Sequence, residues 1–309
     1  MRYPLREGLR VAIVIPTKNH GELVRQCIES IRATVKQVSY DIVLVDHDSD
    51  EPDSLDYFEA LAREGTRVLK YSGPFNFSVI NNWAVAQVEG SYSHYLFCNN
   101  DVEAISAGWL ERMLELGQQE DVGAVGAMLF YPDGKSIQHA GVCVGMFRAA
   151  EHYAKRVQFP DDPIEPGFGE LLRINHEVAA VTAACMLVSR QAFEQIRGFD
   201  EQIAVGFGDV DLCLRLGQAG LRNLFCPHAA LIHHESFTRG TSTADPHPED
   251  SALFRTKWRR LLDRGDPFFS PSLSLWHPSW TLRLPLPASF EINRRVTRRE
   301  PNGRADWMP

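Results

Sequence analysis

Short apolar runs alternate with helix-like patterns through the first third of the chain, and this alternation restricts the possible folds more than any other feature. The runs at 10–16, 41–45, 67–71 and 94–98 are rich in the apolar residues of strands that are buried on both faces. Between them, apolar residues recur three and four positions apart, as on the buried face of a helix. The repeated order of strand and helix predicts an α/β fold with a single, Rossmann-like, mostly parallel central sheet flanked by helices.

Two of these predicted strands end abruptly in acidic or amide side chains. The residues concerned are Asn99, Asn100 and Asp101 after one strand and Asp46, His47 and Asp48 after the other. In open α/β sheets, ligands bind outside the carboxyl ends of the strands. A carboxylate there can hold a hard divalent cation or accept hydrogen bonds from a ribose or a base. The alternative is that these residues only form turns and helix caps, for which Asn and Asp are well suited.

An aspartate at the start of a later predicted helix is the candidate for acid–base chemistry. Asp209 and Asp211 both lie in the first turn of the helix that follows Gly206. Asp211 suits capping or pairing with Arg215, four residues further on. Asp209, at the tip of the helix, is free to face a cleft, where an ionised carboxylate can take a proton from a hydroxyl within hydrogen-bond reach.

Further polar residues follow the predicted strand that ends at His233. A neutral imidazole is a good metal ligand, and Arg239, in the Gly/Ser/Thr-rich loop that follows, can offset the charge of a diphosphate. The strand predicted at 181–188 is rich in small residues, which allows close approach of a ligand or another backbone. The segment 147–176 is polar and rich in Pro and Gly, and it is typical of a long loop or lid.

The composition of the chain, and the motifs that it lacks, argue against several classes of protein. A net charge of -8 argues against nucleic-acid binding, which needs a basic face. No apolar run approaches the roughly 20 residues needed to cross a bilayer, and the N-terminus shows no signal peptide. The six cysteines form no CxxC pair, so we expect buried free thiols in a reducing, cytoplasmic setting. Neither GxGxxG nor GxxxxGK[ST] is present, so a bound nucleotide would need a metal ion in place of a glycine-rich loop.

The order of these motifs resembles that of the family 2 glycosyltransferases, which are inverting enzymes of GT-A fold with nucleotide-sugar donors. The resemblance runs over about residues 10–275. It is carried by the segments VIPTKN (14–19), VDHDS (45–49), FNFSVINN (75–82), CNNDVE (98–103), IQHAG (137–141), GFGDVDLCLR (206–215), HHES (233–236) and DPFFSPSLS (266–274). The last of these looks like the closing segment of bacterial polysaccharide-type members. The resemblance implies a nucleotide-binding half at about 10–103 and a smaller acceptor-side half at about 104–275.

The resemblance also implies roles for individual residues. It implies that Mn²⁺ or Mg²⁺, held by Asp101 and by His233 or His234, bridges the donor diphosphate, and that Asp209 is the catalytic base. The implied donor-binding residues are Pro16, Thr17, Asn19, Asp46, Asp48, Asn82, Asn99, Asn100 and Arg239. The implied acceptor-side residues are Thr182, Asp211 and His139. Two positions depart from the family, since Asn99 stands where many members carry Asp and Gly208 replaces the acid that usually precedes the base.

The implied partners are a nucleotide-sugar donor and a saccharide or lipid-linked saccharide acceptor of bacterial cell-surface polysaccharide synthesis. Residues 276–309 form a tail with a cluster of arginines, which is either solvated or docks a partner domain or the anionic inner face of the cytoplasmic membrane. One rival is a nucleotidyltransferase, which also binds a nucleotide and Mg²⁺ but normally has a glycine-rich loop with a basic residue after the first strand. The other is a non-catalytic, glycosyltransferase-like binding module.

Overall fold

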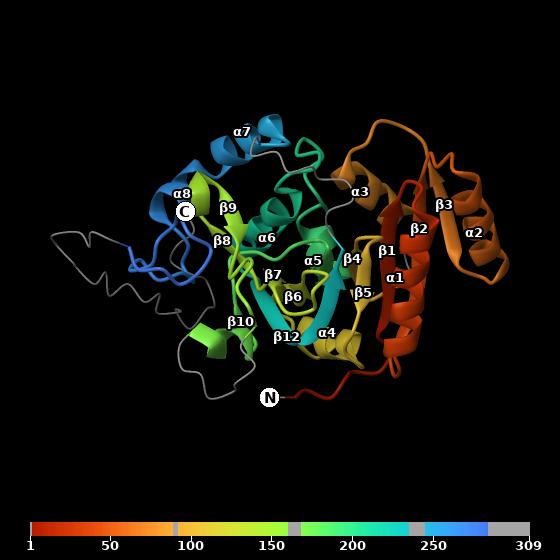
Figure 1. Cartoon of the computed structure of the whole chain (residues 1–309), viewed down its shortest axis with the longest axis horizontal. Helices are drawn as coiled ribbons and strands as arrows, with labels where there is room; N and C mark the ends of the chain where they lie inside the picture. The colour runs from red at the N-terminus through yellow and green to blue at the C-terminus, as the bar shows by residue number, and fades with distance from the viewer. Residues whose placement is uncertain (1, 89–91, 160–167, 235–244, 284–309) are drawn as a thin grey trace.

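A ten-stranded sheet forms the centre of the computed structural model, which describes residues 2–88, 92–159, 168–234 and 245–283 (Figure 1). Eight of its strands follow the order β10-β12-β6-β11-β4-β1-β2-β3, while β5 pairs with β12 and β7 pairs with β6. A second, small sheet consists of β8 and β9. The predicted α/β architecture with one central sheet is therefore confirmed.

The strands of the central sheet are β1 (Arg10–Thr17), β2 (Ser39–His47), β3 (Arg67–Tyr71), β4 (His94–Cys98), β5 (Val102–Ala104), β6 (Val122–Phe130), β7 (Ile137–His139), β10 (His176–Glu177), β11 (Cys185–Ser189) and β12 (Arg222–His233). The small sheet pairs β8 (Val142–Val144) with β9 (Ala150–His152). The helices are α1 (Gly21–Thr34), α2 (Pro52–Arg63), α3 (Phe77–Gln87), α4 (Trp109–Gly117), α5 (Arg190–Gln195), α6 (Gly208–Gln218), α7 (Pro248–Lys257) and α8 (Arg259–Arg264). Two 3₁₀ helices, η1 (Met146–Arg148) and η2 (Phe168–Leu172), complete the elements of the described chain.

The first four strands of the sheet lie where the apolar runs predict them. β1 pairs in parallel with β2 and β4, and β2 pairs in parallel with β3. Alternate β1 side chains join two separate apolar cores, with Val14 in the one that includes α3 and α6 and Ile13 in the one that includes α1 and α4. Because both faces are covered, the strands are apolar throughout, and polar residues appear only where they end.

β11 runs against both of its neighbours, and this reversal shapes the edge of the sheet. Cys185 pairs with Cys98 of β4, and Met186 pairs with Gly126 of β6. Two successive reversals leave β6 and its parallel partner β12 pointing the same way as β4. The amino end of β11 therefore lies beside the carboxyl ends of the parallel strands, where the preceding residues 181–184 join the polar ends of those strands.

Two local predictions in this region need correction. The strand predicted at 181–188 begins only at Cys185, because the Ala183 N–H donates to a side chain of α6 instead of to a neighbouring strand. The long loop predicted at 147–176 contains β9 and η2, and its residues 160–167 lie outside the described chain.

Two polar side chains fix the start of α3. Asn76 is the N-cap, and its side chain accepts a hydrogen bond of 2.9 Å from the Val79 N–H. Ser78 is buried and donates a hydrogen bond of 2.6 Å to the Ile203 carbonyl. Ser78 thus joins α3 to the loop that leads into α6, which a local sequence pattern does not reveal.

The end of the molecule opposite α2 and β3 is built by β8, β9, α7, α8 and the chain that follows α8 (Figure 1). Residues beyond 275, expected to form a tail, pack here as far as they are described. The Ala154 N–H donates to the Pro278 carbonyl at 2.8 Å, and the Trp280 indole N–H donates to the Tyr153 hydroxyl. Residues 284–309, with the arginine cluster of the predicted tail, lie outside the described chain.

Other expectations from composition concern cysteines and membrane spans. All six cysteines are buried and free, which confirms the predicted thiols. In the part of the chain that the structure describes, no helix combines the length and the apolar character that spanning a bilayer requires.

The close approach of residue 181 to β6 gives a test of the packing at this edge. A Cβ atom added at Gly126 would lie 2.4 Å from the Val181 Cβ, whereas one at Gly123 in the same strand would meet nothing nearer than 3.0 Å. We expect Gly126→Ala to lower the free energy of unfolding by about 1–3 kcal/mol through overpacking, and Gly123→Ala to lower it less. Urea unfolding of both variants measures this, and equal losses would refute the proposed steric limit.

Candidate active site

Polar side chains from several elements meet at the carboxyl edge of the sheet. They come from the ends of β1, β2 and β12, from the turn after β4, from β7 and from the start of α6. Most of the residues singled out in the sequence are among them. They form three groups: the Asp101–His233 cluster, a cluster at the end of β2, and an aspartate on α6.

Asp101 and His233 face each other in the first of these clusters. Nε2 of His233 lies 3.1 Å from Oδ1 of Asp101 and 3.0 Å from Nδ2 of Asn99. On the other side of the ring, Nδ1 lies 2.6 Å from Oε1 of Gln138. His233 itself is only 8% exposed, so water competes little for these groups.

The hydrogen bonds of His233 settle its tautomer. Because the amide oxygen of Gln138 can only accept, Nδ1 carries the proton and Nε2 keeps its lone pair. Oδ1 of Asp101 is buried and has no hydrogen-bond partner, although it lies within ion-pair distance of Nε2. An imidazole lone pair and a carboxylate oxygen that converge with no proton between them fit a divalent cation.

The charge of Asp101 is compatible with this use. Burial raises the pKa of its carboxyl, but the neighbouring His233 and His234 and a backbone hydrogen bond together outweigh burial and leave the pKa below its ordinary value. Within the described residues no cluster of three or more His, Cys, Asp or Glu side chains surrounds a common point. The remaining ligands of a cation here would therefore come from amides, water or a bound substrate.

The choice between the two consecutive histidines is also decided by their contacts. His234 points its Nε2 to Glu103, at 3.0 Å, and not to Asp101. Only its backbone N–H reaches Asp101, donating 2.9 Å to the carbonyl oxygen. His233 is therefore the histidine that faces the Asp101 carboxylate.

The second cluster lies at the end of β2. Asp46 is buried and accepts a hydrogen bond of 3.1 Å from the Ser49 N–H. Asp48 is exposed, and the hydrogen bond that its carboxylate accepts from the Ser72 hydroxyl at 2.6 Å lowers its pKa. His47, between them, donates from Nε2 to the Gly73 carbonyl at 2.7 Å, which leaves Nδ1 as a buried acceptor without a partner.

The loop after β1 joins the two clusters. The Thr17 hydroxyl accepts 2.9 Å from Nδ2 of Asn100 and donates 3.0 Å to the Asn19 carbonyl. Oδ1 of Asn19 accepts from the backbone N–H groups of residues 50 and 51, and its Nδ2 donates to Asp50 at 2.7 Å. Asn19 thus holds the two loops together, while Pro16 is half-buried beside them.

Asp209 occupies the first turn of α6, as its position in the sequence predicts. Oδ2 accepts 3.0 Å from the Ala183 N–H, and Oδ1 accepts 2.8 Å from the N–H of Val210. Phe207, the N-cap, has a φ of 66°, a left-handed conformation that costs a residue other than glycine free energy. Its ring stacks on Phe254 of α7, with centroids 4.8 Å apart, and this packing holds the turn that presents Asp209.

The Asp101–His233 cluster and Asp209 lie on either side of the same short segment, residues 183–184. The Asn99 N–H donates 3.0 Å to the Ala184 carbonyl, and the preceding residue, Ala183, donates to Asp209. Asn99 also contacts His233, which faces Asp101. The structure therefore brings the two predicted carboxylates to adjoining positions at one edge of the sheet.

The predicted acceptor-side residues His139 and Thr182 lie on the other side of this segment. Nε2 of His139 is 3.5 Å from the N–H of Thr182 and 3.3 Å from that of Gly141, so it accepts. Its Nδ1 therefore carries a proton, which it donates to Nδ1 of His152 at 2.9 Å. Burial lowers the pKa of His139 well below its ordinary value, so the ring stays neutral.

Two predicted site residues instead hold the scaffold together. Asp211 is fully buried and lies 2.7 Å from Arg215, 2.7 Å from Lys257 and 2.9 Å from the Trp258 indole nitrogen. This corrects its acceptor-side assignment and confirms the alternative of pairing with Arg215.

The amide of Asn82 binds the turn before α6. Its Oδ1 accepts 2.9 Å from the Phe199 N–H, and its Nδ2 donates 3.0 Å to Glu201. The structure thus places both amide atoms on that turn, where they orient the approach to α6. The predicted Arg239 lies outside the described residues.

Two residues of the site were not assigned a role from the sequence. Gln138 sets the tautomer of His233, and Phe75 exposes 55% of its surface beside His47, with ring centroids 5.7 Å apart. Gln138 and Phe75 lie in the segments that carry the resemblance, which was the available signal. Their partners come from distant strands, so spacing along the chain does not identify their contacts.

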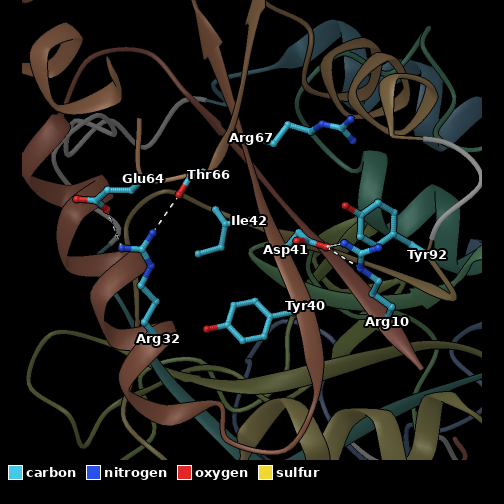
Figure 2. Close-up of a pocket in the computed structure, with 10 residues that line it drawn as sticks. Arg10, Arg32, Tyr40, Asp41, Ile42, Glu64, Thr66, Arg67 and Tyr92 are labelled. Carbon is cyan, nitrogen blue, oxygen red and sulfur yellow. Dashed lines mark hydrogen bonds and ion pairs between the residues drawn. The ribbon is translucent and has the colours of Figure 1, made fainter. Parts of the chain in front are cut away.

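A polar hollow of about 470 Å³ lies at the other edge of the sheet (Figure 2). Arg10 pairs with Asp41 at 2.6 Å, and Arg32 reaches both Glu64 at 3.4 Å and Thr66 at 3.0 Å. These residues surround the amino ends of β1, β2 and β3, so the hollow is separated from the candidate site by the length of the strands.

Comparison with known proteins places these features in a family. The model of glycosyl transferase family 2 matches residues 12–197. The chain is 37% identical to the O-antigen biosynthesis protein RfbC of Myxococcus xanthus over 277 residues, covering 89% of this chain and 21% of that protein. It is 30% identical to an N-acetylglucosaminyl-diphospho-decaprenol L-rhamnosyltransferase of Mycobacterium tuberculosis over 163 residues, covering 52% of this chain and 50% of that protein. The chain therefore spans half or less of the length of these relatives.

Solved structures show the same fold at low sequence identity. A crystal structure of GalNAc-T7 with UDP, GalNAc and Mn²⁺ superposes with a TM-score of 0.63 at 12% identity, covering 84% of this chain and 49% of that one. The mannosyltransferase PcManGT of Pyrobaculum calidifontis, in complex with GDP-Man and Mn²⁺, gives a TM-score of 0.54 at 13% identity over 84% of this chain and 72% of that one. Both comparisons support the predicted GT-A fold.

The different surroundings of the two aspartates of α6 predict different responses to substitution. Asp211→Asn leaves Arg215 without its buried countercharge and leaves Lys257 paired with Asp200 alone, and we expect it to lower the free energy of unfolding by about 3 kcal/mol or more. Asp209→Asn keeps an acceptor oxygen for Ala183 and should cost less than about 1 kcal/mol. Urea unfolding of the two variants tests this, and similar losses would contradict a structural role that is specific to Asp211.

Proposed function

Because the chain belongs to glycosyl transferase family 2, we propose that it transfers a sugar from a nucleotide-diphosphate sugar to an acceptor hydroxyl with inversion at the anomeric carbon. The observation that carries the proposal is the shared segment 182–184, which has the Asp101–His233 cluster on one side and Asp209 on the other. A transferase of this kind needs both a group that stabilises the leaving diphosphate and a base for the incoming hydroxyl.

The Asp101 and His233 side chains would hold a divalent cation, Mn²⁺ or Mg²⁺, with Gln138 keeping the Nε2 lone pair of His233 available. When bound, such a cation neutralises the charge that develops on the departing nucleoside diphosphate. The unpartnered Asp101 oxygen supports this assignment. Support also comes from the Mn²⁺ in the two solved structures of the same fold. Asn99 and Asn100 lie in the same turn, where their amides would orient the donor.

The cluster at the end of β2 would bind the nucleoside. Asp46 and Asp48 offer carboxylate oxygens to ribose hydroxyls or a base, and Nδ1 of His47 offers a buried acceptor to a base N–H. The exposed Phe75 ring beside His47 gives a face on which a base can stack. Thr17 and Asn19 would act here by holding the loops after β1 and β2 in place.

Asp209 would act as the base of the reaction. Its carboxylate would take the proton of the acceptor hydroxyl as the hydroxyl oxygen bonds to the anomeric carbon and the bond from that carbon to the donor diphosphate breaks. The hydrogen bond from Ala183 fixes one oxygen, Oδ2, and so orients the carboxylate. Thr182, the first residue of the shared segment, and the neighbouring His139 and His152 would form the acceptor side of the site.

The names of the relatives suggest a pathway. One relative is named for O-antigen biosynthesis, and another for transfer of rhamnose to a decaprenyl-diphosphate-linked sugar. We infer that this chain works in the synthesis of a bacterial surface polysaccharide, in the cytoplasm or at the inner face of the cytoplasmic membrane. Contact with that membrane through the basic residues beyond 283 is part of the same proposal.

The donor site is tested by thermal unfolding in the presence of UDP-, GDP- and dTDP-sugars, each with and without Mn²⁺. We expect one donor to raise the melting temperature only when Mn²⁺ is present, since ligand binding stabilises the folded state. In Gln138→Leu, His233 loses the partner that fixes its tautomer, and the apparent Mn²⁺ affinity should fall about 10-fold or more. Stabilisation by donors that is independent of metal in the wild type would contradict the metal site.

The base is tested by Asp209→Asn. We expect the transfer rate to fall by a factor of about 10²–10⁴, while metal-dependent donor binding, measured by calorimetry, stays within twofold of the wild type. Wild-type turnover in this variant would remove Asp209 from the base role.

The products of the wild-type reaction distinguish the enzyme classes, because sugar transfer releases a nucleoside diphosphate and nucleotidyl transfer releases pyrophosphate.

A further inference from the structure

A groove of about 670 Å³ lies at the end of the molecule formed by η1, α7 and α8, and the mechanism proposed above does not use it. Its volume falls within the range of small-molecule sites. The charged residues of its lining are Arg148, Arg255, Arg259 and Asp263. Apolar surface comes from Leu262, Leu275 and Trp276. The groove therefore combines an excess of positive charge with an apolar wall.

The positive charge of the groove is only weakly compensated. Arg259 and Asp263 are 4.0 Å apart with side chains 83% and 75% exposed, so this ion pair is weak. Arg148 lies over the ring of Trp276, 5.4 Å from its centroid, a contact that leaves the charge available to an anion. Arg255 interacts electrostatically with Asp245, and among the described residues it forms no ion pair within 4.0 Å.

Both walls of the groove begin at the candidate active site. On one side, β8 and β9 lead from the paired His139 and His152 to the turn that contains Arg148. On the other side, Asp250 in the first turn of α7 accepts hydrogen bonds of 2.8–3.0 Å from the backbone of residues 204–206, just before Asp209. Arg255 lies five residues further along α7, about 8 Å from this anchor.

Two aromatic side chains at the apolar side of the groove are exposed to solvent. Trp276 is 60% exposed and Phe147 is 43% exposed, with ring centroids 6.2 Å apart. Phe147 and Arg148 both have positive φ values, 50° and 63°, and the Phe147 N–H is bound to the Leu275 carbonyl at 3.0 Å. This strained turn presents an aromatic ring and a guanidinium group side by side.

We propose that this groove binds the diphosphate and the first isoprenoid units of a lipid-linked saccharide acceptor, while the sugar of that acceptor extends to Asp209. The guanidinium groups match a diphosphate in charge and in hydrogen-bonding geometry. The exposed Trp276 ring and the half-buried Leu262 and Leu275 side chains match the hydrocarbon that follows it. The chain's own residues 284–309 are a poor occupant, because they carry five arginines against three acidic residues. The inference rests on the proposed glycosyltransferase function.

The experiment measures binding of farnesyl diphosphate to the full chain by calorimetry in EDTA, so that no metal-dependent diphosphate site contributes. Inorganic pyrophosphate and farnesol serve as the two half-ligands. We expect farnesyl diphosphate to bind at least 10-fold more tightly than either of them. Each of Arg148→Gln and Arg255→Gln should weaken its binding about 10-fold, the loss expected for a charge-assisted hydrogen bond.

The matched control is Arg260→Gln, an exposed arginine of α8 that does not line the groove. It should bind farnesyl diphosphate as the wild type does. Trp276→Ala should weaken binding of farnesyl diphosphate more than that of pyrophosphate, and Trp276→Phe should restore most of the difference. All variants should keep the wild-type melting temperature within a few degrees, because the substituted side chains are exposed.

Several outcomes would overturn the inference. Equal affinity for pyrophosphate and farnesyl diphosphate would make the groove a site for free anions, and an equal loss in Arg260→Gln would reduce the effect to net charge. The wild-type protein could bind a nucleotide sugar with Mn²⁺ and fail to bind farnesyl diphosphate. That result would reject the proposed lipid-diphosphate site and leave the proposed transferase function standing. Groove-dependent binding without any nucleotide-sugar binding would instead reject the proposed transferase and leave the lipid-diphosphate site standing.

Discussion

The antiparallel ladder between β4 and β11 is the constraint on which the candidate site depends. A strand inserted against the direction of its neighbours places its amino end where theirs finish. Residues 182–184 therefore lie beside the turn that contains Asn99 and Asp101, and α6 reaches them through Asp209. With β11 in the parallel direction, the same residues would lie at the opposite edge, some five strand residues or roughly 17 Å away.

The polar side chains around this edge fall into two groups, those proposed to contact a ligand and those that bind other parts of the chain. Asp101 and His47 each keep a buried atom without a hydrogen-bond partner, which is costly in a folded protein and supports the proposal that they contact a ligand. Asn19, Asn82 and Asp211 have their polar atoms satisfied by other parts of the chain. Such residues hold loops and helices in position, whereas Asp101 and His47 are proposed to bind the donor or its metal ion. The distinction follows from contacts and not from residue type.

The two walls of the basic groove are continuations of elements that carry the site. Asp250 ties α7 to the backbone before Asp209, and His152 ties β9 to His139. The groove and the proposed acceptor side are therefore connected through two elements of the scaffold, β9 and α7.

The sequence by itself determined the α/β fold, the positions of β1 to β4 and the edge at which polar residues gather. It could do so because burial on both faces demands apolar runs, and those runs end where ligands bind. It also predicted Asp101, His233 and Asp209 as site residues, and the structure brings these three side chains to one edge of the sheet. Tertiary structure decided that His233 and not His234 faces Asp101, and that Asp211 is a buried ion-pair partner. It also decided that Gln138 sets the histidine tautomer. These choices depend on which distant strands lie side by side, and the spacing of residues along one chain carries no record of that pairing.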